Sequence, residues 1–429
     1  MIRNKLTSRM SKDVIWTFSI QLTIMLCSFV VTKLLSTRLS IEDFGQYNVI
    51  KRSVQVLSFV MLAGVGIALP RYIPLYRKTE SPKSIAPLLS ASIIYIIGVS
   101  LLVYLICCIF SEKMQNLVLG EGNTQLFIVA LTYAFVLAMA QFAYAYYRGI
   151  GDFKWYNGAN LCVNLGIIVP LIALPLLTTM NVFTSWLIIT AVLVAFFLGR
   201  ELLKNWRSLS DFKTKFSVLG PTLSTIVKYS SGRLLADFFL FSLSAFPLIY
   251  ISHALDWQPT AYYSIGITFV TMVTPLYSFM GIILLPYVSE CIAKHELKLA
   301  NRFVGKLALI YVSSAMLITA ILYVFISFLT WLFFSENYLV TTSLSRIMIV
   351  SILPQALYLL YRNPIDAVSV IPYNTIILGL CLTVMIVLFS LAQTLTEFAW
   401  AYVAVSFIQG ILSWVAWIVL NKRSNFGVL

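Results

Sequence analysis

The segment ALPRYIPLYRK, residues 68–78, recurs as LLPYVSECIAK, residues 284–294, so the two copies lie 216 positions apart (284 − 68). A second echo relates YRGIGD, residues 147–152, to YRNPID, residues 361–366. The positions identical at the first offset include Lys12 and Lys228, Tyr47 and Tyr263, Pro70 and Pro286, and Lys78 and Lys294. Self-similarity at a fixed spacing indicates a duplicated structural unit. The sequence therefore predicts two related halves.

The composition indicates an all-α polytopic membrane protein. Of 429 residues, 60% are hydrophobic and 11% are charged, and the mean hydropathy is +0.91. A soluble domain is about half apolar and about a quarter charged. The apolar runs are continuous rather than alternating, which favours helices over strands, and about 20 such residues cross a bilayer. They predict twelve spans, at residues 14–36, 47–70, 87–110, 124–147, 155–177, 184–199, 229–251, 260–289, 305–331, 342–361, 371–391 and 398–420.

The basic residues set the predicted orientation. With the N-terminus inside, the inside segments carry most of the 30 Lys and Arg residues, whereas the outside loops carry Arg38 and Lys113. Loops rich in Lys and Arg stay in the cytoplasm, so both termini are predicted to be cytoplasmic. The net charge of +14 is then a topology signal, and no nucleic acid partner is expected.

Each half holds six spans, an even number, so both halves share one orientation, as in transporters built from parallel repeats. The predicted organisation is an N-terminal six-helix lobe, residues 1–200, a basic cytoplasmic linker carrying a surface-lying helix, residues 201–228, and a C-terminal six-helix lobe, residues 229–429. A substrate would bind between the halves, and rocking of one half against the other would give alternating access.

The sequence argues against an enzyme. The tripeptide DFG at residues 43–45 matches the magnesium-binding motif of protein kinases, but the glycine-rich and catalytic loops of a kinase are missing from the sequence. The six cysteines form no CxxC pair, and His253 and His295 have no ligand partners nearby in the sequence. No ATP-binding motif is present. We therefore expect a transporter without cofactor or metal.

Four segments carry a resemblance to a known family: STRLSIEDFGQYNVIK at residues 36–51, ALPRYIP at 68–74, YYRGIGDFKWYN at 146–157 and YRNPIDA at 361–367. With the topology of nearly the whole chain, they resemble the polysaccharide transporters of the multidrug/oligosaccharidyl-lipid/polysaccharide exporter superfamily. The match is nearest to flippases for O-antigen and related repeat units.

The resemblance implies a fold and a function. The fold would be a MATE-like, V-shaped pair of pseudo-symmetric six-helix bundles, with a central cavity lined largely by the first, second, seventh and eighth spans. The function would be transport of an undecaprenyl-pyrophosphate-linked oligosaccharide across the inner membrane of a bacterium, for the biosynthesis of lipopolysaccharide or another surface polysaccharide.

Charged residues inside spans are costly and are functional candidates. Here they are Lys33, Lys51, Arg52, Arg233, Arg346 and the acid Asp237. The excess of cations suits an anionic substrate, whose phosphates guanidinium groups can bind with two hydrogen bonds; Arg52 and Arg233 are the first candidates. The alternatives are snorkelling to the interface and, for Arg233 and Asp237, a structural ion pair between residues four apart on one helix. Asp237 could still act in ion coupling.

Aromatic and cytoplasmic residues form a second set of candidates. Tyr262, Tyr263 and Tyr277 could stack on sugars, although anchoring at the membrane interface also explains tyrosines. Asn157, Asn160 and Asn164 share one face of the fifth span, where hydrogen bonds between helices are the simpler explanation. Two pairs at the cytoplasmic span ends, Arg148 with Asp152 and Arg362 with Asp366, could form ion pairs that cap helices or latch an inward-closed state.

Two other functions are weighed against the flippase. A MATE-type antiporter for drugs or cations needs carboxylates in its cavity, and Asp237 is the only acid predicted well inside a span. A membrane-embedded glycan polymerase needs a large outside loop, and none is predicted. Coupling to H⁺ or Na⁺ and flow drawn by downstream polymerase machinery both stay open. The expected partners are the lipid-linked oligosaccharide and membrane lipids.

Overall fold

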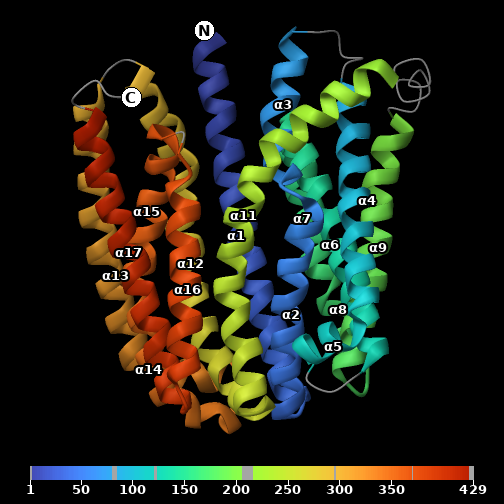
Figure 1. Ribbon diagram of the computed structural model, residues 1–429, viewed down its shortest axis with the longest axis vertical. Coiled ribbons are helices and arrows are strands. Elements are labelled where there is room, and N and C mark those ends of the chain that lie inside the picture. Colours follow the sequence, from blue (N-terminus) through green and yellow to red (C-terminus); the bar gives the residue numbers. More distant parts are fainter. Residues whose placement is uncertain are drawn as a thin grey trace. The chain divides into compact units, whose positions relative to one another are not determined.

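The computed structural model describes residues 2–79, 85–119, 123–204, 216–293, 296–369 and 371–424, which are almost entirely helical and contain no strand (Figure 1). The chain packs as two units, Met1–Phe238 and Phe239–Leu429. Ten helices in these ranges are long and apolar enough to cross a membrane, or eleven if one bent pair is a single span. The protein is thus a multi-pass membrane protein.

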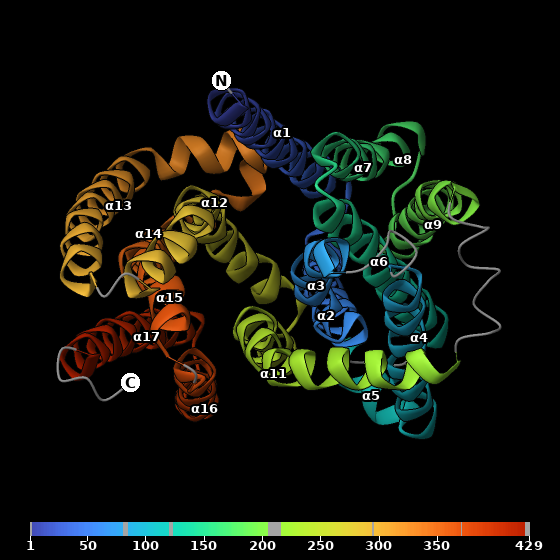
Figure 2. The ribbon, with the colours of Figure 1, turned by 90° about the horizontal axis from the view of Figure 1, so that it is seen from above.

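The first unit is built around α6. Its helices are α1 (Ile2–Arg38), α2 (Ile41–Leu62), α3 (Val65–Thr79), α4 (Ile85–Ile109), α5 (Ser111–Leu119), α6 (Thr124–Ile150), α7 (Phe153–Gly166), α8 (Ile168–Ala173), α9 (Thr179–Lys204) and the first part of α11 (Phe216–Ala254). Seen from above, α6 lies among α2, α3, α7 and α9 (Figure 2). Buried alanines such as Ala134, Ala138 and Ala145 let these neighbours approach closely.

The second unit is built around α15. It continues α11 and adds α12 (Trp257–Ala293), α13 (Leu297–Phe333), η3 (Glu336–Thr341), α14 (Thr342–Met348), η4 (Ile349–Ser351), α15 (Ile352–Val368), α16 (Tyr373–Leu391) and α17 (Leu395–Ser424). α15 packs against α12, α13 and α17. A Cβ at Gly410 of α17 would lie 2.6 Å from the carbonyl oxygen of Pro354, so this crossing requires glycine.

Each of the twelve predicted spans overlaps helical structure, but ten or eleven segments of the described residues are long and apolar enough to cross a membrane, and some predicted bounds are wrong. The tenth span, predicted at 342–361, is the longer segment Glu336–Val368, which includes two 3-10 turns. The sixth span, predicted at 184–199, is α9, which begins at Thr179 and continues through two charged residues to Lys204. The seventh, predicted at 229–251, belongs to α11, which already begins at Phe216. The second half of the predicted linker is therefore continuous with this helix, while residues 205–215 lie outside the described ranges.

The DFG tripeptide, which falls before the second predicted span, is not in a loop between spans but at the start of α2. Ser40 caps this helix, because its hydroxyl accepts a hydrogen bond from the Asp43 amide at 3.0 Å. The acids Glu42 and Asp43 suit the positive end of the helix dipole. The tripeptide therefore serves to begin a helix.

The second predicted span is broken into α2 and α3, which meet at an angle of 41°. At the break, Ala63 and Gly64 have left-handed backbones with φ of 52° and 74°. A Cβ at Gly64 would lie 2.9 Å from both the Cβ and the carbonyl oxygen of Ser230 in α11. Glycine is required here for conformation and for space.

Gly64→Ala is expected to destabilise the protein by about 2 kcal/mol or more, because a left-handed L residue costs about 1–2 kcal/mol and the added methyl meets the backbone of Ser230. The measurement is the apparent melting temperature in detergent. Gly158→Ala is the matched control, since nothing lies within 4 Å of its Cβ position in a helix. Equal melting temperatures for the two variants would contradict this account.

Arg38, at the end of α1, is held by the end of another helix. Its guanidinium donates hydrogen bonds to the carbonyls of Leu171, of Leu174 at 2.6 Å and of Pro175 at 2.9 Å. The last carbonyls of a helix lack partners within it, and α8 ends at Ala173. This cation, counted above in an outside loop, therefore caps a helix.

Candidate functional site

The first unit encloses a cavity of about 330 Å³ between α1, α2, α6, α7 and α9. Its polar lining consists of Ser28, Lys51, Gln55, Gln141, Asn160 and Asn164. Three aromatic residues, Tyr133, Tyr144 and Trp186, also line it. A mostly apolar cavity that lies between membrane-spanning helices and presents a few polar groups is the strongest binding-site candidate in the described residues.

Lys51 is the only charged side chain among the described residues that line this cavity. Its Nζ lies 5.6 Å from the centroid of the Tyr47 ring, which is a cation–π contact. Tyr47 is itself fixed by Phe183 and Trp186, whose ring centroids both lie 5.8 Å away. In the described part of the chain, Lys51 has no ion pair and no hydrogen bond through its ammonium. The cavity therefore holds a positive charge that no carboxylate neutralises.

One amide of the cavity lining, Gln141, has a hydrogen-bond acceptor without a partner among the described groups. The Gln141 amide donates to the Ser58 hydroxyl at 3.5 Å. Ser58 in turn donates to the carbonyl of Gln55 at 2.8 Å, so its oxygen accepts from Gln141. This leaves the buried Oε1 of Gln141 without a partner among the described groups. A buried carbonyl oxygen with no donor is unusual and indicates a place for a hydroxyl or amine.

The three asparagines predicted to share one face of the fifth span have two different surroundings. Asn160 and Asn164 line the cavity, and the Asn164 amide donates to the backbone carbonyl of Asn160 at 2.8 Å and to its side chain at 3.1 Å. Asn157 instead donates to the Thr17 hydroxyl at 2.9 Å, which joins α7 to α1. The hydrogen bonding between helices expected of this face is thus seen at Asn157.

Lys33, Arg52, Asp237 and Arg346 are not among the residues that line the cavity. Arg52 donates to Gln55, which does line the cavity, at 3.5 Å. Lys33 and Asp237 are partly buried in α1 and α11. Arg346 belongs to the second unit, where its guanidinium lies 5.2 Å from the centroid of the Tyr323 ring. The side chain of Arg233 is outside the described part of the structure, so its pairing with Asp237 stays a prediction.

The three tyrosines proposed to contact sugars have different surroundings. Tyr263 is fully buried, and its hydroxyl donates to the Phe398 carbonyl at 3.4 Å, so its ring serves packing within the second unit. The Tyr262 hydroxyl accepts a hydrogen bond from Gln258 at 2.8 Å. Tyr277, which is also buried, lies 3.3 Å from the Ser314 hydroxyl. Sugar contact at these positions stays a prediction.

The first predicted latch pair is not an ion pair in this structure. Arg148 donates to the Gly66 carbonyl at 2.8 Å, beside the break between α2 and α3. Asp152 caps α7 by accepting from the Trp155 amide at 3.3 Å, so the capping role is seen for this residue.

In the second pair, Asn374 bridges the two residues. Its amide donates to the backbone carbonyl of Arg362 at 2.8 Å and to the carboxylate of Asp366 at 2.7 Å. This bridge fastens the start of α16 to α15. A latch that changes with transport state stays a prediction for both pairs.

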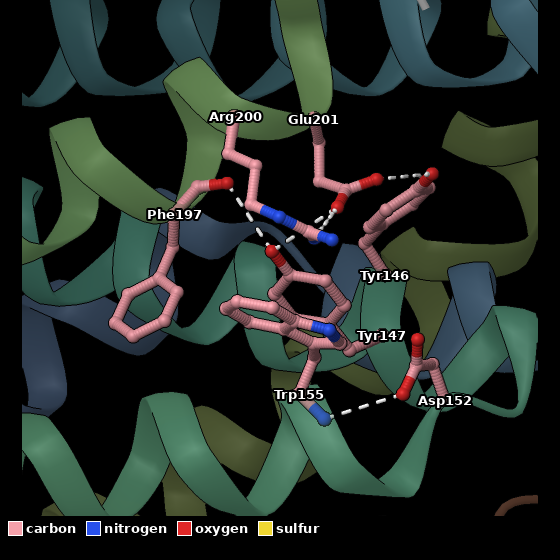
Figure 3. A network of polar contacts seen from close by, with 7 residues as sticks. All are labelled: Tyr146, Tyr147, Asp152, Trp155, Phe197, Arg200 and Glu201. Atoms are coloured by element: carbon pink, nitrogen blue, oxygen red, sulfur yellow. Dashed lines mark hydrogen bonds and ion pairs between the residues drawn. The ribbon is translucent and has the colours of Figure 1, made fainter. Parts of the chain in front are cut away.

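A buried acid that sequence reasoning missed lies at the end of α9. Glu201 is 6% exposed, pairs with Arg200, and accepts from the hydroxyls of Tyr146 at 3.3 Å and Tyr147 at 3.5 Å (Figure 3). The Arg200 guanidinium lies 3.7 Å from the centroid of the Trp155 ring. This network joins α6, α7 and α9 at one end of the first unit.

The fold is that of a membrane transporter. The chain resembles the inward-facing form of a multidrug resistance MATE family transporter of the MOP superfamily, with a TM-score of 0.74 at 12% identity over 96% of this chain and 98% of that chain. The chain also resembles lipid II flippase MurJ in an inward closed conformation, with a TM-score of 0.68 at 13% identity over 96% of this chain and 91% of that chain. A third similar structure is a MOP superfamily transporter from Pyrococcus furiosus, described as having a binding pocket of reverse polarity. Its TM-score is 0.64 at 15% identity over 97% of this chain and 94% of that chain.

Sequence comparison then places the chain in a family. It belongs to the polysaccharide biosynthesis protein family, whose sequence profile matches residues 10–292. No curated protein matches the chain by sequence. At the identities given above, the solved structures show the fold alone.

Proposed function

We propose that the protein is a flippase that moves a lipid-linked oligosaccharide, of the undecaprenyl-pyrophosphate-linked O-antigen type, across the bacterial inner membrane by alternating access. The observation that carries this proposal is the charge of the cavity in the first unit, where Lys51 is accompanied by amides and aromatic rings and by no acid among the described lining residues. Such a lining attracts an anion that also carries hydroxyl groups. Membership of the polysaccharide biosynthesis family supports the same substrate class.

A MATE-type antiporter is the second candidate, because that fold is shared. It is disfavoured by the same cavity, since a fixed ammonium repels the Na⁺, H⁺ or cationic drug that an antiporter must bind. The basic inside segments support cytoplasmic termini, with the glycan loaded from the cytoplasmic leaflet and polymerised on the other side.

Deletion of the gene tests the proposal. We expect lipid-linked repeat units to accumulate facing the cytoplasm, and surface polysaccharide to be lost, with recovery on complementation. Unchanged surface polysaccharide together with increased sensitivity to drugs would reject the flippase and favour the antiporter.

Arg52→Ala is expected to lower glycan export severalfold in a complemented deletion strain. Its guanidinium reaches Gln55 of the cavity lining and adds positive charge beside Lys51. The measurement is surface glycan per unit of membrane-inserted protein, with Arg52→Lys as the variant that keeps the charge. Full export by Arg52→Ala would assign this residue to snorkelling or packing instead.

A further inference from the structure

We propose that the cavity of the first unit binds one acidic sugar residue, a ring that carries a carboxylate and several hydroxyl groups. This inference rests on the proposed function and narrows its substrate class to glycans that contain such a residue. The site is the cavity lined by Lys51, Gln55, Gln141, Asn160, Tyr133 and Trp186.

The charge of the cavity calls for one negative group. Lys51 lies within the membrane-spanning part of α2, and its contact in the described structure is the face of Tyr47. Lys51 is half-buried, and a charge within a membrane-spanning helix is costly unless it is paired. A ring face replaces only part of the hydration of an ammonium. A single carboxylate matches this single positive charge.

The unpaired amide oxygen of Gln141 favours an occupant that has hydroxyl groups. Gln141 Oε1 is buried without a partner. The terminal torsion of a glutamine is broad, so a modest rotation turns this oxygen toward an occupant of the cavity. A phosphate diester donates no hydrogen bond and would leave Gln141 Oε1 without a partner, whereas a sugar hydroxyl can donate to this oxygen and accept from a neighbouring amide. The lining therefore favours a hydroxylated carboxylate over a phosphate.

The walls and the volume suit a sugar ring. Trp186 is held in place because its indole N–H donates to the Ile167 carbonyl at 2.9 Å. Tyr133 packs beside it, with ring centroids 6.3 Å apart. Apolar and aromatic walls with a few placed polar groups are typical of small-molecule sites, and about 330 Å³ lies at the small end of their range.

Binding of simple probes to the purified full-length protein tests the inference. At matched ionic strength, sodium glucuronate is expected to raise the melting temperature in proportion to its occupancy, whereas glucose, chloride and dimethyl phosphate, a phosphate diester, leave it within error. Lys51→Gln is expected to weaken glucuronate binding by about tenfold or more, which corresponds to the loss of about 1.4 kcal/mol. Gln141→Leu is expected to weaken it severalfold.

Lys113→Gln is the matched control, because it makes the same chemical change at an exposed position on α5 and should bind glucuronate as the unaltered protein does. Lys51→Arg keeps the charge and tests the site if Lys51→Gln fails to fold. Equal binding of glucose and glucuronate, tighter binding of dimethyl phosphate or chloride, or unchanged binding in Lys51→Gln would each overturn the inference. If export depends on the gene but glucuronate does not bind, only this inference falls; if export does not depend on the gene, the proposed function falls.

Discussion

Lys51→Gln is expected to reduce glycan export by about tenfold or more while the protein still inserts into the membrane at normal abundance. The substitution removes the only charge among the described lining residues and keeps a side chain that can form hydrogen bonds. The loss of an ion pair worth about 1.4 kcal/mol corresponds to this factor. The measurement is surface polysaccharide in a deletion strain that expresses each variant at equal level.

Two comparisons make the result specific. Lys51→Arg keeps the positive charge and is expected to retain most of the export, whereas Lys113→Gln, exposed on α5, should export normally. Normal export by Lys51→Gln would mean that the ammonium contributes to packing on Tyr47 and not to substrate binding.

Arg200→Met is expected to destabilise the protein by about 2–3 kcal/mol. The variant removes the cation that pairs with the Glu201 carboxylate, whose side chain is 8% exposed and also accepts hydrogen bonds from two tyrosine hydroxyls. Breaking a fully buried pair costs about 3–5 kcal/mol, and the value is lower here because 34% of the Arg200 side chain is exposed. The measurement is the apparent melting temperature by heating and size-exclusion chromatography.

The double variant Arg200→Met with Glu201→Met separates the lost pair from the lost packing on Trp155. Because removal of both charges leaves no buried ion, the double variant is expected to be more stable than Arg200→Met alone. A double variant that is equally unstable would instead assign the cost to the stacking of the Arg200 guanidinium on Trp155.

The sequence predicted the spans well and their ends poorly, and α9 illustrates why. A search for runs of about 20 apolar residues ends each predicted span at the first charged residue, which here is Arg200. The helix continues because Glu201 finds its partners on another helix, in Tyr146 and Tyr147. Hydropathy along one helix does not contain that information, so the buried acid was missed.

The cavity inside the first unit was not predicted, since the sequence placed the cavity between the two halves, along the first, second, seventh and eighth spans, and that central cavity stays a prediction. Lys51 stood out as a charge in an apolar run, and Gln55, four residues later, shares its helix face. Gln141 and Trp186 come from α6 and α9, and only the packing of these helices against α2 brings them to the same space. Gln141 could have been identified as a candidate from the sequence, because it is an amide inside the apolar run 124–147.

The capping of α8 by Arg38 has a consequence for topology mapping. In the folded chain, three carbonyls between Leu171 and Pro175 hold this guanidinium. A truncation at residue 40 that carries a fused reporter lacks those carbonyls. With the N-terminus inside, as the sequence predicts, it leaves an uncapped cation at the outer end of the first span, where a cation opposes translocation. Truncation fusions near this position are therefore biased toward the wrong orientation, and reporters inserted into the complete chain, which keep this cap, are the sound choice for mapping the first loop.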